Sequence, residues 1–325
     1  MKIASREYRP ADFSLGQTQE MMVTLGKVGF SPEMAAIVAN AKSGKATEIV
    51  SLFTTAAEES SLDWLETILA KESKVHQDFF GQKFYLVPFR DTLEKYGPKT
   101  VSQWQKLGLE PHFLPLVAIP QDADFLGWKI KPNNWYYERV AESKILWRLI
   151  DGQLAANREA FKLPGKTVLI DTRLKPQYRD GKQIFKNDNL LGPIIKRLRQ
   201  VGEIADYEYG PPSSRFGVSA EEWEGYIKPA LAKFLDVEVS QVRLERAIEA
   251  NVIPQLYSYM PRENDGKTNT WVWYEEYFGG ASSRLDGGSS VFGGLSSVSY
   301  YSAGNHWEIQ AFRPLVVLGD WVLAN

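Results

Sequence analysis

Five side chains near the carboxyl end form the densest group in the sequence that is suited to contact a ligand. They are Tyr300, Tyr301, Asn305, His306 and Trp307. Aromatic rings offer a large contact area at little entropic cost, and small polar side chains offer adaptable hydrogen bonds. The surrounding residues, 279–310, are poor in charge and rich in Gly, Ser and aromatic side chains. Packing is the competing interpretation, because one of two adjacent residues on a strand points inward.

The same stretch supplies further small polar and aromatic side chains that we expect to contact a ligand, namely Ser290, Phe292, Ser296, Ser297, Ser299 and Ser302. Phe292 also fits a place in the core, as does Leu295. Gly287 and Gly288 are interpreted as turn residues that need a permissive backbone. They are not a phosphate-binding loop, because no helix with Gly-Lys-Ser or Gly-Lys-Thr follows them.

Cysteine and histidine, which many catalytic and metal sites use, are absent or scarce. The chain has no cysteine, which excludes disulfides, thiolate metal ligands and cysteine nucleophiles. Its histidines, His76, His112 and His306, are far apart in the sequence and form no metal motif. Glu275 and Glu276 could act as an acid–base pair, but without a nucleophile beside them we interpret them as a solvated strand end. We expect no catalytic residue, no metal and no cofactor.

Composition limits the class of protein. The chain has 325 residues, enough for two domains or one large one, and its 44% hydrophobic content fits a globular core. A net charge of −2 argues against a protein built around nucleic-acid phosphates. The sequence contains no run of about 18 apolar residues, so we expect no membrane span. The amino terminus lacks the apolar core of a signal peptide. We therefore expect a cytoplasmic protein that does not bind nucleic acid.

Apolar spacing in the first half of the chain predicts helices over residues 1–75. Short apolar runs at 84–89 and 113–120 predict extended segments. A helix is expected from Glu138 to residue 150, and the break at 163–165 indicates a domain boundary. The sequence thus predicts a mostly helical accessory region over 1–160, with some extended segments, and a second domain over 165–325.

The second half alternates strands and helices. Strands are expected at 167–171, 270–274 and 312–318, a hairpin turn at 178–183, and helices at 190–201, from Ser219 onward, and at 240–250, the last ending before Pro254. Ser219 and Glu222 have the spacing of a capping box.

Several residues of the second half are expected to serve the structure. Trp271 and Trp273 would face one side of their strand, toward the core or the floor beneath the loops. Asp171 with Arg173, and Arg313 in the last strand, are interpreted as an ion pair or loop anchor, since one Arg can bind several carbonyl groups.

Three segments in order carry a family resemblance. Residues 242–250 (VRLERAIEA), 269–273 (NTWVW), and 284–289 (RLDGGS) followed by 311–315 (AFRPL) resemble motifs of formylglycine-generating-enzyme-like (sulfatase-modifying-factor) domains. The resemblance implies an α+β, C-type-lectin-like fold over 165–325, in which two helices pack on a small twisted antiparallel sheet with long loops. It assigns structural roles to Arg243, Trp271, Trp273, Gly287, Gly288 and Arg313.

The chain departs from the catalytic members of that family. The oxidising members hold copper with paired cysteines, which this chain lacks, and the sulfoxide-synthase relatives hold iron with a histidine cluster. The Glu-Pro-Asn and Trp-Asn-Asp signatures of calcium-binding lectins are also absent. A metal-dependent oxidoreductase of this class is therefore the alternative interpretation. A structural or phage-associated interaction protein is a third.

A narrower resemblance is to the variable proteins of bacterial diversity-generating retroelements. In these proteins a segment before the final strand is mutated at template adenines and displayed on a fixed backbone. Residues 289–306 all belong to the set that such codons reach, whereas Trp307, Glu308 and Gln310 do not. The resemblance implies a ligand-binding protein with a diversified carboxyl-terminal surface. Its ligand would be a protein or other macromolecule.

Overall fold

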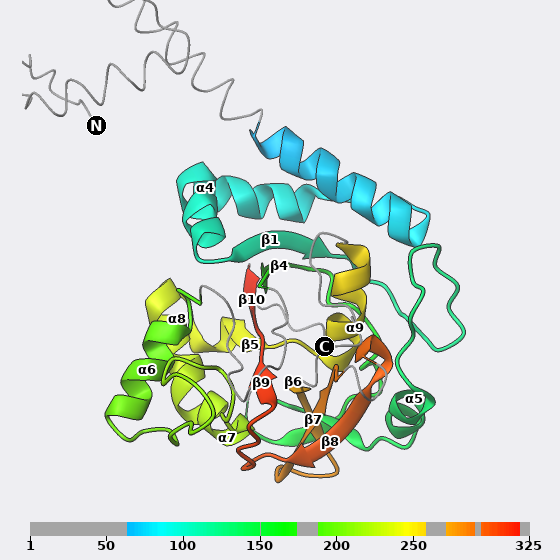
Figure 1. The fold of residues 1–325 in the computed structure, drawn as a ribbon. Coiled ribbons are helices and arrows are strands. Elements are labelled where there is room, and N and C mark those ends of the chain that lie inside the picture. Colours follow the sequence, from blue (N-terminus) through cyan, green and yellow to red (C-terminus); the bar gives the residue numbers. More distant parts are fainter. Residues whose placement is uncertain (1–63, 150, 174–187, 258–270, 290–293, 319–325) are drawn as a thin grey trace, which may run out of the picture. The chain divides into compact units, whose positions relative to one another are not determined.

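A computed structural model describes residues 64–149, 151–173, 188–257, 271–289 and 294–318 (Figure 1). The fold is α+β with mainly antiparallel sheets, and a compact unit begins at Trp64. The predicted helices of residues 1–63, the predicted turn at 178–183, and the candidate contact residues Ser290 and Phe292 lie outside the described residues.

Two helices open the described chain, over residues 64–80 and in α4 (Val87–Lys106). The prediction of an extended segment at 84–89 is wrong from Val87 onward, because α4 begins there with Pro88 in its first turn, where the missing N–H is tolerated. A kink follows at Gly97, whose φ is 75°. Both helices bury apolar side chains, among them Leu69 and Leu93, in the core above β1 (Leu109–Leu114).

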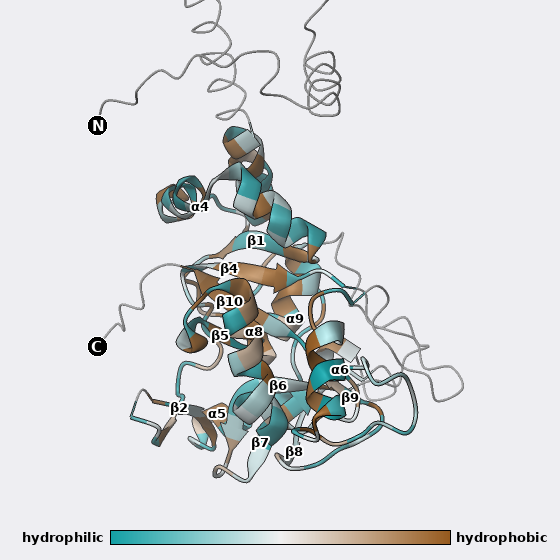
Figure 2. Cartoon of the chain, turned by 90° about the vertical axis from the view of Figure 1, so that its left-hand side faces the viewer, coloured by the Kyte–Doolittle hydropathy of each residue, from teal (hydrophilic) through white to brown (hydrophobic). Residues whose placement is uncertain are grey.

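A four-stranded antiparallel sheet has the order β1-β4-β10-β5, formed with β4 (Lys166–Asp171), β10 (Pro314–Leu318) and β5 (Val242–Leu244). The predicted strand at 167–171 is confirmed as β4. Leu169 and Val316 face one hydrophobic cluster, while Val168 and Val317 face the other. Because both faces are covered, β4 and β10 are apolar along most of their length (Figure 2).

A second sheet has the order β3-β2-β6-β7-β8, with β9 paired in parallel to β6. Its strands are β2 (Ile145–Arg148), β3 (Leu154–Ala156), β6 (Trp271–Phe278), β7 (Ser283–Gly287), β8 (Val298–Ser302) and β9 (Gln310–Phe312). The predicted strand at 312–318 is divided at Arg313, so β9 belongs to this sheet and β10 to the other.

The expected helix from Glu138 to residue 150 is shorter and earlier. Helix α5 covers Asn134–Ala141, and the chain then turns at Ser143, whose φ is 59°. Ile145 and Leu146 pair with β6 instead of continuing the helix. Pairing with an existing strand outweighs the weak helical spacing of this short apolar run.

Helices cover the sheets on two sides. On one side lie α6 (Gly192–Gln200) and the continuous helical stretch of α7 (Ala220–Glu222), a π-helical turn (Trp223–Ile227) and α8 (Lys228–Leu235) (Figure 1). On the other side lie α9 (Ala247–Leu256) and α5. The capping box is confirmed, because Glu222 N donates to Ser219 Oγ at 3.1 Å and Ser219 N donates to Glu222 Oε2 at 2.9 Å.

The predicted helix at 240–250 is displaced along the chain. A 3₁₀ turn (Val239–Gln241) leads into β5, because Val242 and Leu244 point into one hydrophobic cluster while their strand pairs with β10. Helix α9 starts at Ala247 and passes through Pro254 to Leu256 instead of ending before the proline.

Strands from both sides of the expected 160/165 boundary share both sheets. In the first sheet β1 pairs with β4, and in the second β2 pairs with β6. Residues 109–156 are therefore built into the same body as the carboxyl-terminal half.

Candidate functional site

An open cleft of about 380 Å³ lies where the second sheet meets the α7 helical stretch. Strands β2, β6 and β7 provide one wall, the helical stretch provides another, and small side chains leave the space between them. The lining residues are Arg148, Tyr277 and Arg284 on the sheet, Ala220, Glu221, Glu224 and Gly225 on the helix, and Ala281 and Ala303 in the turns.

Strand register assembles the sheet wall. Tyr277 of β6 pairs with Arg284 of β7, which pairs with Tyr301 of β8, so the three side chains share one face. The Arg284 guanidinium carbon lies 4.2 Å from the Tyr277 ring centroid. Arg148 reaches the same tyrosine from β2, and its Nε and Nη2 donate to Tyr277 Oη at 3.1 and 2.6 Å. Both guanidinium groups are within cation–π range of the ring.

The two arginines differ in how their charges are compensated. Arg284 is buried and donates to Glu224 Oε1 at 3.1 and 3.0 Å, and its Nη2 lies 3.4 Å from Glu275 Oε2. Arg148 is exposed and has no carboxylate at ion-pair distance within the described ranges. Its hydrogen bond to the Tyr277 hydroxyl raises the Arg148 pKa, so the guanidinium stays charged.

An aromatic pair stands on β8 and the turn that follows it. The Tyr301 and Trp307 ring centroids are 4.4 Å apart, and the two residues are 37% and 36% exposed. His306 Nε2 lies 3.0 Å from Glu222 Oε2, which connects this turn to the capping box of α7. The aromatic pair is thus tied to the helical wall as well as to the sheet.

Tyr300 occupies the opposite face of β8. Its ring stacks on Phe278 at 4.1 Å and on Trp135 at 5.8 Å, and it remains 47% exposed. Neither Tyr300 nor Tyr301 points into the core, in contrast to the packing interpretation. The five-residue cluster is therefore divided between the two faces of an edge strand, and only Tyr301, His306 and Trp307 lie on the side of the cleft.

The remaining candidate contact residues vary in exposure. Ser302 is exposed, whereas Ser296 and Asn305 are half-buried. Ser297 is only 4% exposed and is out of reach of a macromolecule. The Ser299 hydroxyl donates to Asp286 Oδ1 at 2.6 Å, which uses its donor inside the protein.

Buried side chains of β6 and β7 make polar contacts with neighbouring segments. Asp286 also accepts from Gln310 Nε2 at 2.9 Å, and burial raises the pKa of Asp286 to about 6. Trp271 and Trp273 are both buried, and Trp273 Nε1 donates to Val218 O at 3.0 Å. Asp286 thus connects β7 to β8 and to β9, and Trp273 connects β6 to the segment before α7.

The two glycines after Asp286 have different roles. Gly288 adopts φ 81°, a conformation that glycine favours. Gly287 is instead the last residue of β7, where an added Cβ would lie 2.0 Å from Ser297 O and 2.6 Å from Tyr274 Oη. Close approach of the backbone, rather than a turn, explains Gly287.

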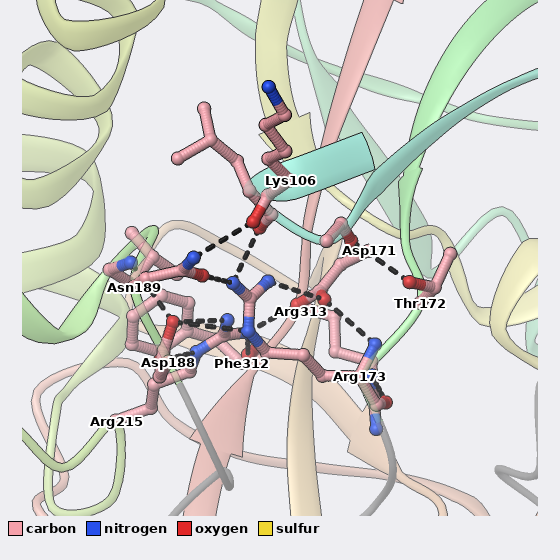
Figure 3. A network of polar contacts seen from close by, with 12 residues as sticks. Lys106, Asp171, Thr172, Arg173, Asp188, Asn189, Arg215, Phe312 and Arg313 are labelled. Carbon is pink, nitrogen blue, oxygen red and sulfur yellow. Dashed lines mark hydrogen bonds and ion pairs between the residues drawn. The ribbon is translucent and has the colours of Figure 1, made fainter. Parts of the chain in front are cut away.

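A buried ionic network joins the two sheets (Figure 3). Asp171 pairs with Arg173 at 3.1 Å and with Arg215, which also binds Asp188. Arg313 Nη1 donates to Arg173 O at 2.7 Å. The ion pair expected between Asp171 and Arg173 is confirmed. Arg215 and Asp188 escaped sequence analysis, because they lie far along the chain from Asp171 and resemble ordinary charged loop residues.

Arg243, which the resemblance marked as structural, forms a two-pronged ion pair in the core. Its Nη1 and Nη2 donate to Glu249 Oε2 and Oε1 at 2.6 and 2.7 Å. The pair connects β5 to the first turn of α9.

The interpretation of Glu275 and Glu276 as a solvated strand end is wrong. Glu276 is 1% exposed and accepts from Ala247 N at 3.1 Å, and burial raises its pKa to about 7. Glu275 is half-buried and accepts from Leu244 N at 2.9 Å. Both carboxylates link β6 to neighbouring backbone, and neither opens into the cleft.

Two of the histidines are also internal. His76 Nε2 lies 2.9 Å from Phe113 O, and His112 Nδ1 lies 3.0 Å from Glu72 Oε2. Glu72 further accepts from Tyr257 Oη at 2.6 Å, which ties the first helix to α9. No group of three or more His, Asp or Glu side chains in the described parts of the chain is arranged to hold a metal ion.

Comparison of the chain with protein-family models, with curated proteins and with solved structures finds no match. Among the described helices, none combines the length and apolar character needed to cross a lipid bilayer.

Proposed function

We propose that this chain is a ligand-binding protein that recognises a protein or other macromolecule through the face of β8 that borders the cleft. The observation that carries the proposal is the exposed Tyr301–Trp307 pair, in which Tyr301 stands on β8, Trp307 follows the strand, and the neighbouring His306 contacts Glu222 of α7. Aromatic anchors on a rigid frame are the residues that dominate binding energy in protein interfaces. The proposal includes no catalytic step, metal or cofactor.

The pairing of early and late strands within residues 165–325 supports the proposed C-type-lectin-like fold. The first strand of this range, β4, pairs with its last, β10, and α8 and α9 pack on strands of this unit. Strands β1, β2 and β3 extend the two sheets from outside that range. A scaffold closed in this way would keep its shape while side chains on β8 change.

We also propose that these side chains are diversified in the manner of a retroelement variable protein. Tyr300, Tyr301 and Ser302 are exposed and fit that role, whereas the buried Ser297 does not. His306 is exposed too, but a change there would remove the contact with Glu222. The proposal requires a near-identical template copy of the codons for residues 289–310, differing at adenines, beside a reverse transcriptase gene. A cytoplasmic location without nucleic-acid binding is part of the same proposal. No described cluster favours the oxidoreductase alternative.

Selection from a random-peptide display library tests the binding surface. We expect enriched peptides to lose affinity for a Tyr301→Ser, Trp307→Ser double variant by at least about tenfold, since truncating interface aromatics costs about 2 kcal/mol or more. Tyr85→Ser is the matched control, because Tyr85 is 74% exposed and precedes α4, away from β8. Peptides that bind the double variant as well as the natural chain would refute the proposal.

A further inference from the structure

We infer that the cleft recognises a carboxylate on an extended segment of the protein ligand, and that Arg148 is the residue that binds it. The inference rests on the proposed function and names the chemistry of its ligand. Three observations carry it: the free donors of Arg148, the ion pairs of Arg284, which is the other cation lining the cleft, and the position of the aromatic pair.

The geometry of Arg148 leaves one side of its guanidinium available. A guanidinium has five N–H donors, and Arg148 uses one on Nε and one on Nη2 for Tyr277 Oη. Both donors of Nη1 and the second of Nη2 remain. One donor of Nη1 and the remaining donor of Nη2 point the same way and form the fork that binds a carboxylate with two parallel hydrogen bonds. The two hydrogen bonds to Tyr277 Oη, with the guanidinium carbon 5.1 Å from the ring centroid, orient this fork before a ligand arrives.

Among the described residues that line the cleft, Arg148 is the cation without a carboxylate partner. Arg284 is compensated by Glu224 and Glu275, and Lys228 Nζ lies 3.2 Å from Glu224 Oε2. Glu221, on the helical wall, is exposed and in no ion pair with any described residue. An anionic group would therefore lie against the sheet wall, away from Glu221. One unpaired guanidinium suits the single charge of a carboxylate better than the double charge of a phosphate.

The surroundings of Arg148 favour a peptide segment as the carrier of that carboxylate. The cleft is open, and alanine and glycine residues line much of it. Tyr301, the register partner of Arg284, adjoins this wall, and the Trp307 ring contacts the Tyr301 ring at a tilt of 38°. A segment with an acidic residue near an apolar or aromatic one would place its charge on Arg148 and its apolar side chain on the rings.

The test uses peptides enriched by display, synthesised with a fluorescent label and titrated with the full chain. We expect Arg148→Gln to weaken binding about ten- to a hundredfold, because a charge-assisted hydrogen-bonded pair is lost. Arg148→Lys should restore part of the loss, since it keeps the charge without the fork. Arg158→Gln is the control, because Arg158 is exposed and outside the cleft. Glu221→Gln should tighten binding several-fold at low salt.

Peptide variants complete a double-mutant cycle. Replacing the peptide's Glu by Gln, or amidating its carboxyl terminus, identifies which carboxylate is bound, and the effective change should add no further loss to Arg148→Gln. Equal affinity of Arg148→Gln and the natural chain, or tighter binding of a phosphoserine peptide, would overturn the inference. Peptides that depend on Tyr301 and Trp307 but not on Arg148 would leave the proposed function standing, so the two failures are distinct.

Discussion

At the scale of single residues, the pKa of a buried carboxylate is raised or lowered according to whether a cation forms an ion pair with it. Burial raises the pKa of Glu276 to about 7, and no cation forms an ion pair with it within the described part of the chain. Burial also opposes ionisation of Glu249, but Arg243 at 2.6 Å attracts the charged form and holds its pKa at about 2. Glu276 therefore changes its charge near neutral pH, whereas Glu249 is charged at neutral pH.

Replacing Glu276 by Gln should remove a pH dependence of stability. The folded-state pKa is raised, so the stability associated with Glu276 is complete below 4.5, the unfolded value, and is lost as pH rises through about 7. A shift of this size corresponds to on the order of 3 kcal/mol. Urea unfolding should show Glu276→Gln more stable than the natural chain above the folded-state pKa and similar to it at acid pH.

The control for this measurement is Glu138→Gln, because Glu138 is an exposed residue of α5. That variant should follow the pH profile of the natural chain. A Glu276→Gln profile parallel to the natural one would show that Glu276 does not titrate in this window.

At the scale of elements, the β7–β8 pair determines where the exposed aromatic residues stand. Its contact distance is set by Gly287, and its register places Tyr301 beside Arg284. Local patterns predicted elements such as the capping box at Ser219 and the strand β4. They failed at 145–148, because a four-residue apolar run fits a helix and a strand equally well until its pairing partner is known.

We expect Gly287→Ala to destabilise the protein by about 2 kcal/mol or more and to weaken ligand binding, since the added Cβ would displace the Ser297 carbonyl and with it β8. Thermal unfolding and peptide titration would measure both effects. Gly280→Ala is the matched control, because no atom lies within 4 Å of its added Cβ. Unfolding temperatures that fall equally in both variants would contradict this account of Gly287.

At the scale of the whole molecule, the ionic network of Figure 3 and the β9–β10 segment join the two sheets. The five residues of the cluster could be named from the sequence because they are nearly contiguous, but their division between the two sides of β8 could not. The sequence did not reveal the cleft, because Arg148, Glu224, Tyr277 and Arg284 are brought together only by strand pairing and by the packing of α7 on the second sheet. No local pattern encodes that arrangement.

Because the ionic network is buried, removing one of its charged side chains should lower the free energy of unfolding. Arg215→Ala would leave the buried Asp171 and Asp188 sharing Arg173 as their ion-pair partner among the described residues, so we expect a loss toward the lower end of the roughly 3–5 kcal/mol that breaking a buried pair costs, about 3 kcal/mol. Arg215→Lys should cost less but still destabilise, because an ammonium cannot serve both carboxylates with the same geometry. Calorimetry would measure both, with Arg158→Ala as the exposed control. A neutral result for Arg215→Ala would mean that the network adds nothing to stability.

The central place of β10 has a consequence for biosynthesis. Because β10 lies between β4 and β5, the first sheet cannot be completed until residues 314–318 have left the ribosome. Until then the nascent chain holds apolar strands with open edges, and such species are prone to aggregate. This topology makes formation of the first sheet dependent on the last of its four strands in the sequence.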